Sequence, residues 1–320
     1  QASTRYGKIE DMVLGLKVVL PDGRTLEVRP VARRAVGPSI KDLFVGAEGT
    51  LGIITQLTIR IWRKPEREIG IVLAFPNLEA ALTSARQIMQ AELRPAVVRL
   101  YDEEESRART EGMPEFRDRP ILGIMMFTGS ERLATVESEL ALEITRRHGA
   151  VVTTDEPLRH WQENRYVAYS MKWQTQRYYM DTIEVTGAWS QLMAMYARMR
   201  EAARAVHPDI HFGAHWSHVY PEGACLYMTI RLPPMADETA LELHARAWDR
   251  ISRICLELGG SISHHHGVGA FRNPWIGMEL NTGLDLLQGL KDAIDPNNIM
   301  NPGKLALRGR PGAMTLDPKA

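Results

Sequence analysis

Short apolar segments of strand length alternate with amphipathic segments of helix length from residue 69 to residue 258, and this alternation constrains the fold more than any other feature. The order strand, helix, strand, strand, helix occurs first between residues 69 and 148, where a short strand follows. It recurs between residues 180 and 258. Two such units are typical of an α+β fold built on one sheet. The sequence therefore predicts a duplicated, ferredoxin-like α+β sheet with its helices on one face.

The expected elements follow from these patterns. Strands are predicted at Ile69–Phe75, Ala96–Tyr101, Ile121–Thr128, Met180–Val185, Ile210–Val219 and Cys225–Leu232. Helices are predicted at Leu78–Glu92, Glu131–His148, Trp161–Gln176, Trp189–Val206, Glu238–Leu258 and Leu284–Ile294. Before residue 65 we expect a hairpin over residues 11–28, turning at Pro21-Asp22-Gly23, and a strand over Ile53–Trp62.

Composition narrows the class of protein. The chain has 320 residues, enough for two domains, and its 39 basic residues balance 39 acidic ones, so bulk charge gives no reason to expect nucleic acid as a partner. Cys225 and Cys255 form neither a disulfide framework nor a C-x-x-C metal motif, which suits a cytoplasmic protein. No apolar run reaches the roughly 20 residues of a membrane span. Because Gln1 replaces an initiator Met, we expect a fragment of a longer chain.

A glycine-rich loop, Gly46-Ala47-Glu48-Gly49-Thr50-Leu51-Gly52, directly precedes an expected strand. Glycines let a backbone approach a ligand and turn its N–H groups toward it. Phosphate loops of the Walker and Rossmann types are followed by a helix, so this loop belongs to neither type. Taken alone, it is equally well explained as a tight turn between two elements.

Three adjacent histidines, His264, His265 and His266, form the sharpest chemical feature. In an extended segment His264 and His266 would face one side and His265 the other. Histidine moves protons near neutral pH, which suits general acid–base work. The alternatives are a metal site, which would need further ligands, or a polar loop without chemistry.

The segment G-A-E-G-T-L-G-I-I-T, from Gly46 to Thr55, resembles the flavin-contacting segment of the FAD-linked oxidase/transferase superfamily, the vanillyl-alcohol-oxidase/PCMH type. Ser3-Thr4-Arg5-Tyr6-Gly7 resembles the preceding FAD-contacting loop. The resemblance implies FAD as cofactor, contacted by Ser3, Thr4, Tyr6, Gly7, Glu48, Gly49, Gly52, Ile53 and Ile54.

The same resemblance implies a domain organisation. Residues 1–64 would be the C-terminal half of a PCMH-type FAD-binding domain, whose N-terminal half would carry the pyrophosphate loop. Residues 65–263 would be the substrate or cap domain, and residues 264–320 a segment returning to the flavin.

Within the superfamily, the run from Gly259 to Gly269 looks most like the alkylglycerone-phosphate synthases. That resemblance implies exchange of acyl for alkyl on acyl-dihydroxyacetone phosphate, with Tyr220, His264, His265 and His266 as catalytic residues. Arg99 and Lys172 would bind the substrate, a small molecule that is phosphorylated or lipid-like. The protein would then be cytoplasmic or peripheral to a membrane, and a homodimer is compatible with the sequence.

Two departures keep alternatives open. The segment Ile299–Lys304 is more like the oxidases and dehydrogenases, which favours as an alternative an FAD-linked oxidoreductase that oxidises a 2-hydroxy acid or another alcohol. Around His215 and His218 the metal-bearing dehydrogenases have His-x-Gly-Asp-Gly-Asn-x-His, whose Asp-Gly-Asn core is missing here, so no metal is expected. A third alternative is a non-catalytic binding module.

Overall fold

The computed structural model describes residues 2–167, 173 and 175–309. The chain forms two compact units that are each discontinuous in sequence. One, which we call the sheet unit, comprises Gln1–Tyr6 and Lys64–His264. The other, the glycine-loop unit, comprises Gly7–Arg63 and His265–Ala320. In the described residues no helix is both long and apolar enough to cross a membrane.

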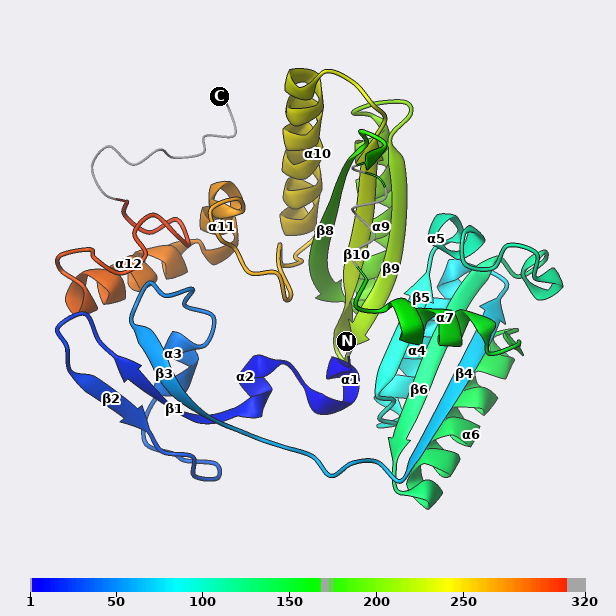
Figure 1. Ribbon diagram of the computed structural model, residues 1–320, viewed down its shortest axis with the longest axis horizontal. Coiled ribbons are helices and arrows are strands. Elements are labelled where there is room, and N and C mark those ends of the chain that lie inside the picture. Colours follow the sequence, from blue (N-terminus) through cyan, green and yellow to red (C-terminus); the bar gives the residue numbers. More distant parts are fainter. Residues whose placement is uncertain (1, 168–172, 174, 310–320) are drawn as a thin grey trace. The chain divides into compact units, whose positions relative to one another are not determined.

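Within its described residues, the sheet unit is built on seven antiparallel strands in the order β7-β4-β6-β5-β9-β10-β8 (Figure 1). The strands are β4 (Arg67–Phe75), β5 (Val97–Tyr101), β6 (Ile121–Gly129), β7 (Val151–Val152), β8 (Tyr179–Ala188), β9 (His211–Val219) and β10 (Gly223–Leu232). The order β7-β4-β6-β5 is that of a ferredoxin-like βαββαβ unit, and the order β8-β10-β9 repeats its first three strands. The two repeats join where Leu100 and Tyr101 of β5 pair with Trp216 and His215 of β9. The predicted duplicated α+β fold is confirmed.

The second repeat has only a trace of its fourth strand. In the first repeat, β7 begins four residues after the last helix, beyond Gly149 at φ +78°. In the second, Ser261 lies at the same offset beyond Gly259 at φ +76°, and it pairs with Thr186 of β8 as a single antiparallel bridge. This bridge fixes the chain three residues before His264.

Four long helices pack on one face of this sheet, because each carries an apolar stripe that the sheet buries. They are α4 (Leu78–Gln90), α6 (Glu131–Arg147), α9 (Trp189–Arg204) and α10 (Asp237–Glu257). Helix α4 begins at Asn77, whose side chain accepts a hydrogen bond from the N–H of Ala80 at 2.8 Å. On α9, Met195 and Met199 are fully buried and are therefore packing residues.

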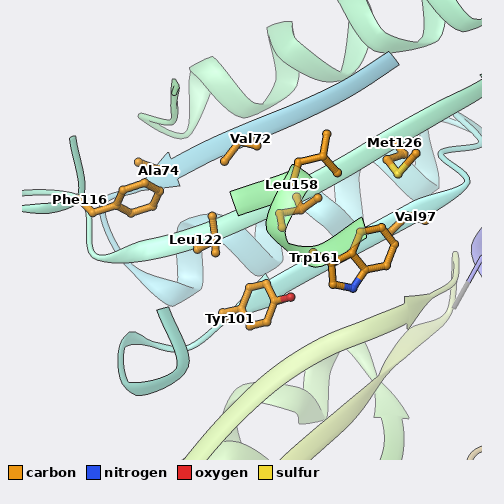
Figure 2. Packing of buried hydrophobic residues seen from close by; sticks show 10 residues of the cluster. Val72, Ala74, Val97, Tyr101, Phe116, Leu122, Met126, Leu158 and Trp161 are labelled. Carbon is orange, nitrogen blue, oxygen red and sulfur yellow. The ribbon is translucent and has the colours of Figure 1, made fainter. Parts of the chain in front are cut away.

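The expectation that all helices lie on one face is wrong for α7 (Glu156–Asn164), which lies across β4 and β6 on the opposite face (Figure 1). Leu158 and Trp161 of α7 pack into a cluster that includes Val72, Tyr101 and Phe116 (Figure 2). The helix predicted over Trp161–Gln176 is also wrong in its bounds, because α7 starts earlier, with Pro157 in its first turn, and ends at Asn164. Residues 168–172 and 174 of that range lie outside the described residues.

Short elements complete the sheet unit. They are α1 (Ser3–Tyr6), α5 (Glu103–Arg107) and the 3₁₀ turn Pro114–Phe116. Helix α5 starts at Asp102, whose carboxylate caps it by accepting from the N–H of Glu105 at 2.8 Å.

The glycine-loop unit contains a small antiparallel sheet with the order β2-β1-β3. Its elements are α2 (Ile9–Met12), β1 (Val13–Val19), β2 (Thr25–Val28), α3 (Ile40–Phe44), β3 (Ile53–Ile59), α11 (Asn273–Leu280) and α12 (Thr282–Ile294). The predicted hairpin is confirmed, whereas β3 ends three residues before the predicted Trp62 and the sequence analysis missed α11. Strand β3 is an edge strand, with Ile53 and Ile54 58% and 38% exposed.

Candidate functional site

In the sheet unit, a hydrogen bond joins two of the predicted catalytic residues. The phenol oxygen of Tyr220 lies 2.9 Å from Nε2 of His264. Tyr220 occupies the turn between β9 and β10, which is closed by its N–H donating to the carbonyl of Gly223 at 2.8 Å. The indole N–H of Trp189 donates to the carbonyl of Tyr220 at 3.1 Å. The phenol therefore sits on a braced turn and faces an imidazole that can exchange a proton with it.

A fully buried carboxylate, Glu184 of β8, holds the histidine segment in place. One of its oxygens accepts from Oγ of Ser263 at 2.8 Å, and the other accepts from the backbone N–H of His264 at 2.6 Å. Cys225 lies beside it, with Sγ 3.9 Å from the carboxylate. Glu184 thus holds the side chain of Ser263 and the backbone of His264, which helps to position the imidazole.

The N-terminal helix α1 supplies the hydroxyl groups around this pair. Oγ of Ser3 lies 3.1 Å from the phenol oxygen of Tyr220 and 2.6 Å from Nδ1 of His218. Oγ1 of Thr4 accepts from the N–H of Val219 at 3.3 Å. The phenol of Tyr6 lies 2.9 Å from Oγ1 of Thr128 on β6. The side chains of Ser3, Thr4 and Tyr6 therefore contact the histidine site and its sheet, and their contact with FAD stays a prediction.

A row of polar and aromatic side chains crosses four strands on the same face as α7. Cross-strand pairing places Tyr101, His215, Tyr227 and Glu184 in line. The ring of His215 stacks on Tyr227 at 4.7 Å between centroids and lies 5.6 Å from the ring of Tyr101. Burial raises the pKa of Tyr227, so its phenol stays neutral. Three strand spacings make this row roughly 14 Å long, with His264 at the Glu184 end.

Arg99, the predicted substrate-binding arginine, lies at the other end of the row. It is 9% exposed on β5, and its Nε donates to the phenol oxygen of Tyr101 at 2.8 Å. Its guanidinium carbon is 5.3 Å from the ring centre of Tyr101 and 5.7 Å from that of Trp161. Among the described residues no carboxylate pairs with Arg99. The guanidinium group of Arg99 is thus oriented by aromatic rings and keeps N–H donors for an anion. Lys172 lies outside the described residues.

The same geometry bears on the expected absence of a metal. Ligand atoms of Glu184, Cys225 and His264 lie within 4.8 Å of one another. His215 and His218, in contrast, have separate surroundings, because His215 stacks in the aromatic row and His218 bonds to Ser3. The absence of metal stays a prediction. If it is wrong, Glu184, Cys225 and His264 are the residues that would bind a metal.

In the glycine-loop unit, the loop from Gly46 to Gly52 meets the segment after the histidines. The carboxylate of Glu48 accepts from the N–H groups of Val268 and Gly269 at 2.6 and 2.8 Å. Glu48 itself has φ +50°, a conformation that costs energy for a residue with a Cβ. His265 and His266 precede that segment, and the centroids of their rings lie 4.5 Å apart. The side chain of Glu48 therefore joins this loop to the Val268–Gly269 segment of the same unit.

This loop fits the FAD that the resemblance implies. Gly49, at φ +74°, has no atom nearer than 3.9 Å to where a Cβ would be, so its backbone is open to a ligand. Beyond it, the exposed Ile53 and Ile54 offer an apolar surface to a planar ring. At position 52 glycine is required by packing instead, because a Cβ there would lie 2.6 Å from Cγ1 of Val18. Gly7 likewise packs closely, on Asp11.

A buried ion pair holds the glycine-rich loop from Gly46 to Gly52 in place. Lys291 of α12 donates to Asp295 at 2.5 Å, to the carbonyl of Thr50 at 2.8 Å and to that of Met300 at 2.6 Å. Desolvation would raise the pKa of Asp295, but the bonds from Lys291 and from the N–H groups of Met300 and Ile299 outweigh it and hold the pKa below its usual value. All three protons of the ammonium group are thus satisfied, and the Thr50 carbonyl is fixed.

Together these features define a class. A duplicated ferredoxin-like sheet carries a tyrosine–histidine pair, and a separate unit offers a glycine loop that fits a flavin. These are the features expected of a flavoprotein of the FAD-linked oxidase type.

Comparison with known proteins supports this class and gives the family. Residues 64–305 match the family model described as FAD linked oxidases, C-terminal domain, and the chain belongs to that family. It is 33% identical over 322 residues to the FAD-linked oxidoreductase YgcU of Escherichia coli K12, covering 95% of this chain and 66% of YgcU. It is 29% identical to the alkyldihydroxyacetonephosphate synthase of Dictyostelium discoideum, covering 95% of this chain and 54% of the synthase. The chain thus spans between about half and two thirds of the length of these relatives.

Solved structures show the same fold. An alkyldihydroxyacetonephosphate synthase structure superposes with a TM-score of 0.71 at 24% identity, covering 94% of this chain and 55% of the other. The 4-ethylphenol oxidase of Gulosibacter chungangensis superposes with a TM-score of 0.73 at 17% identity, covering 94% of this chain and 66% of the other. At these identities the likeness extends to the fold alone.

Two residues, Glu184 and Lys291, escaped the sequence analysis, and for Ser3 the sequence predicted only a contact with FAD. Ser3 is 215 positions from His218, so no local pattern could connect the two. Glu184 gave a signal that was passed over, since it is an acidic residue within an otherwise apolar strand segment, Ile183–Val185. Among the described residues, Lys291 is the one buried residue of α12, and only the fold shows that it is buried.

Proposed function

We propose that this protein is an FAD-dependent enzyme in which His264, paired with Tyr220, takes a proton from a hydroxyl-bearing substrate. The observation that carries the proposal is the 2.9 Å contact between the phenol of Tyr220 and Nε2 of His264, on a segment held by the buried Glu184. A positioned imidazole of this kind typically contributes about 10²- to 10⁴-fold to a rate.

The first candidate reaction is the exchange of acyl for alkyl on acyl-dihydroxyacetone phosphate, which is suggested by three relatives that are alkyldihydroxyacetonephosphate synthases. Here His264 would deprotonate the incoming alcohol or the substrate carbon. Arg99, oriented by Tyr101 and Trp161, would hold the phosphate through its free donors. FAD, when bound, supplies the ring system against which the substrate carbon reacts.

The second candidate is oxidation of a 2-hydroxy acid. It is favoured by relatives of nearly equal identity, a probable D-lactate dehydrogenase of Danio rerio at 29% and the glycolate oxidase subunit GlcD of Bacillus subtilis at 28%. In that reaction FAD, when bound, would supply the hydride acceptor. His264 would take the hydroxyl proton, and Arg99 would hold the carboxylate. The same chain residues serve both reactions, so the substrate decides between them.

The experiment uses the full-length, flavin-loaded protein. It is mixed without oxygen with D-lactate, glycolate or acyl-dihydroxyacetone phosphate plus a fatty alcohol. Bleaching of the flavin that an electron acceptor reverses supports oxidation, whereas ether-lipid product without such bleaching supports exchange. His264→Ala should abolish whichever reaction is seen and leave flavin content unchanged. Wild-type turnover in His264→Ala would overturn the proposal. Loss of activity with a chelator, restored by zinc, would overturn the absence of metal and point to Glu184, Cys225 and His264.

A further inference from the structure

A strained histidine lies close to the catalytic pair without belonging to it. Cys225 of β10 pairs with Ser217, and Ala224 pairs with Val219, so His218 is the extra residue of a β-bulge. Its φ of +56° is costly for a residue with a Cβ. Bulges often re-aim a side chain beside an active site. In a regular strand, alternation would give His218 the same side of the sheet as the buried Trp216, whereas the bulge brings it to Ser3.

The bulged histidine closes an uninterrupted chain of hydrogen bonds. Nδ1 of His218 lies 2.6 Å from Oγ of Ser3, Oγ of Ser3 lies 3.1 Å from the phenol oxygen of Tyr220, and that oxygen lies 2.9 Å from Nε2 of His264. The two imidazole rings are 4.9 Å apart between centroids. Ser3 is only 7% exposed, so its hydroxyl is largely shielded from bulk water.

Such a chain has two proton arrangements. Each hydroxyl carries one proton and can accept another. In the first arrangement Nε2–H of His264 donates to Tyr220, Tyr220 donates to Ser3, and Ser3 donates to Nδ1 of His218. In the second arrangement all three bonds are reversed. Moving one proton along each bond converts the first into the second and transfers one positive charge from His264 to His218.

We propose that Ser3, Tyr220 and His218 form a proton relay that removes from His264 the proton it takes from the substrate. The inference rests on the proposed role of His264 as base. A proton accepted at Nδ1 of His264 makes this ring cationic. Its Nε2 proton then passes to Tyr220, the phenol proton to Ser3 and the Ser3 proton to Nδ1 of His218. His264 ends neutral and His218 cationic, with atoms and charge conserved. His218 and Ser3 act through His264, so they are positioning residues.

Other titratable groups also face this chain. Glu184 and Cys225 lie beside His264, and His265 follows it in sequence. Near Ser3, Arg5 is paired with Glu137 at 3.2 Å. The pH dependence of any variant therefore includes these groups, and the test needs a variant that leaves all of them in place.

Ser3→Ala meets that need, because it removes one hydroxyl and no titratable group. In the full-length, flavin-loaded enzyme we expect kcat to fall about tenfold or more with KM and the flavin spectrum unchanged, and the acid limb of the kcat–pH profile to move. Added imidazole should restore part of the rate in Ser3→Ala. Ser3→Thr keeps a hydroxyl and should retain most of kcat. The matched control is Ser138→Ala, which removes a buried hydroxyl of α6 that donates to the carbonyl of Thr135 at 2.8 Å and lies outside the relay.

A measurement without turnover is the titration of both imidazoles in ¹⁵N-histidine-labelled protein. In the wild type His218 and His264 should titrate as a coupled pair, and in Ser3→Ala their coupling should weaken. The relay is wrong if Ser3→Ala keeps the wild-type kcat and pH profile while His264→Ala is inactive. It is also wrong if Ser3→Ala changes only KM or flavin binding, as a structural role would. If His264→Ala itself keeps wild-type turnover, the proposed function fails instead.

Discussion

Arg99 shows how far a single residue can be assigned from sequence and where structure must take over. The sequence suggests a substrate arginine, but a lone arginine on a strand more often faces solvent. The structure places it 9% exposed between Tyr101 and Trp161. Its orientation depends on α7, a helix whose bounds and sheet face the sequence did not predict, since nothing local in Glu156–Asn164 says which face it will cover.

Replacing Arg99 by Lys tests its role as an anion clamp. Lysine keeps the charge but loses the planar fork and the stacking on Tyr101 and Trp161. We expect KM for the anionic substrate to rise about tenfold or more, corresponding to about 1.4 kcal/mol, with kcat nearly unchanged. Steady-state kinetics of the flavin-loaded enzyme measure this. Arg109→Lys, which alters another arginine near Tyr101, serves as the control. A fall in kcat at constant KM would contradict the clamp.

Asp102 gives the sheet unit a pH dependence of its own. It is 1% exposed, and burial raises its pKa to about 6 even though it accepts bonds from Glu105, Ala214 and Tyr196. In the unfolded chain the pKa is near 3.9. Between about pH 4 and pH 6 the folded state therefore holds a proton that the unfolded state has released. Stability should fall as pH rises through this window, by roughly 3 kcal/mol in total.

The variant Asp102→Asn cannot ionise, so it should lack this slope. The measurement is the free energy of unfolding in urea at several pH values from 4 to 7. Other groups titrate alike in both proteins and cancel in the difference. The wild type should lose stability relative to Asp102→Asn as pH rises from 4 to 6. A constant difference across this range would show that the carboxylate is ionised throughout.

At the level of elements, most of the fold follows from periodicity. The long helices and the seven strands have apolar patterns strong enough to locate them within a few residues, and the repeated order predicts the ferredoxin-like pairing. The helix α11 was missed because Asn273–Leu280 is short and lacks an amphipathic pattern. The bulge at His218 was also beyond reach, because it depends on the pairing of β9 with β10 and on no residue type.

Two glycines with opposite surroundings test the packing of these elements. A Cβ on Gly223 would lie 2.0 Å from the carbonyl oxygen of Gly187, so Gly223→Ala must push β8 and β10 apart. We expect it to cost about 1–3 kcal/mol. Gly289 lies inside α12 with nothing within 4 Å of a Cβ, so Gly289→Ala should stabilise by about 0.5–1 kcal/mol. Chemical denaturation measures both. Equal effects of the two substitutions would refute this view of the packing.

At the scale of the whole molecule, the two units should respond separately to a local lesion. Lys291→Met leaves the buried Asp295 without its cation and frees the Thr50 carbonyl. Breaking a buried pair in this way typically costs about 3–5 kcal/mol. We expect amide exchange to accelerate in β1 of the glycine-loop unit and to stay unchanged in β6 of the sheet unit.

Arg253→Met is the control for that experiment, because it breaks an exposed pair with Asp249, and such pairs contribute about 0–1 kcal/mol. Hydrogen–deuterium exchange with mass spectrometry reports both units in one sample. If Lys291→Met accelerates exchange in β6 as much as in β1, the chain unfolds as one cooperative body and the separation is wrong.

The single bridge between Thr186 and Ser261 has an evolutionary consequence. If one ancestral unit gave rise to both repeats, the descendants diverged at the place where the first forms β7 and the second continues into His264. Reducing one edge strand to a single bridge would have released backbone that a reactive loop could occupy, whereas the first copy kept its short edge strand β7. On that view, a loop with new chemistry would have formed in the copy that lost this strand pairing. The polar segment Thr153-Thr154-Asp155 after β7 is the corresponding position in the first copy, and there a second reactive loop could be grafted with least disturbance.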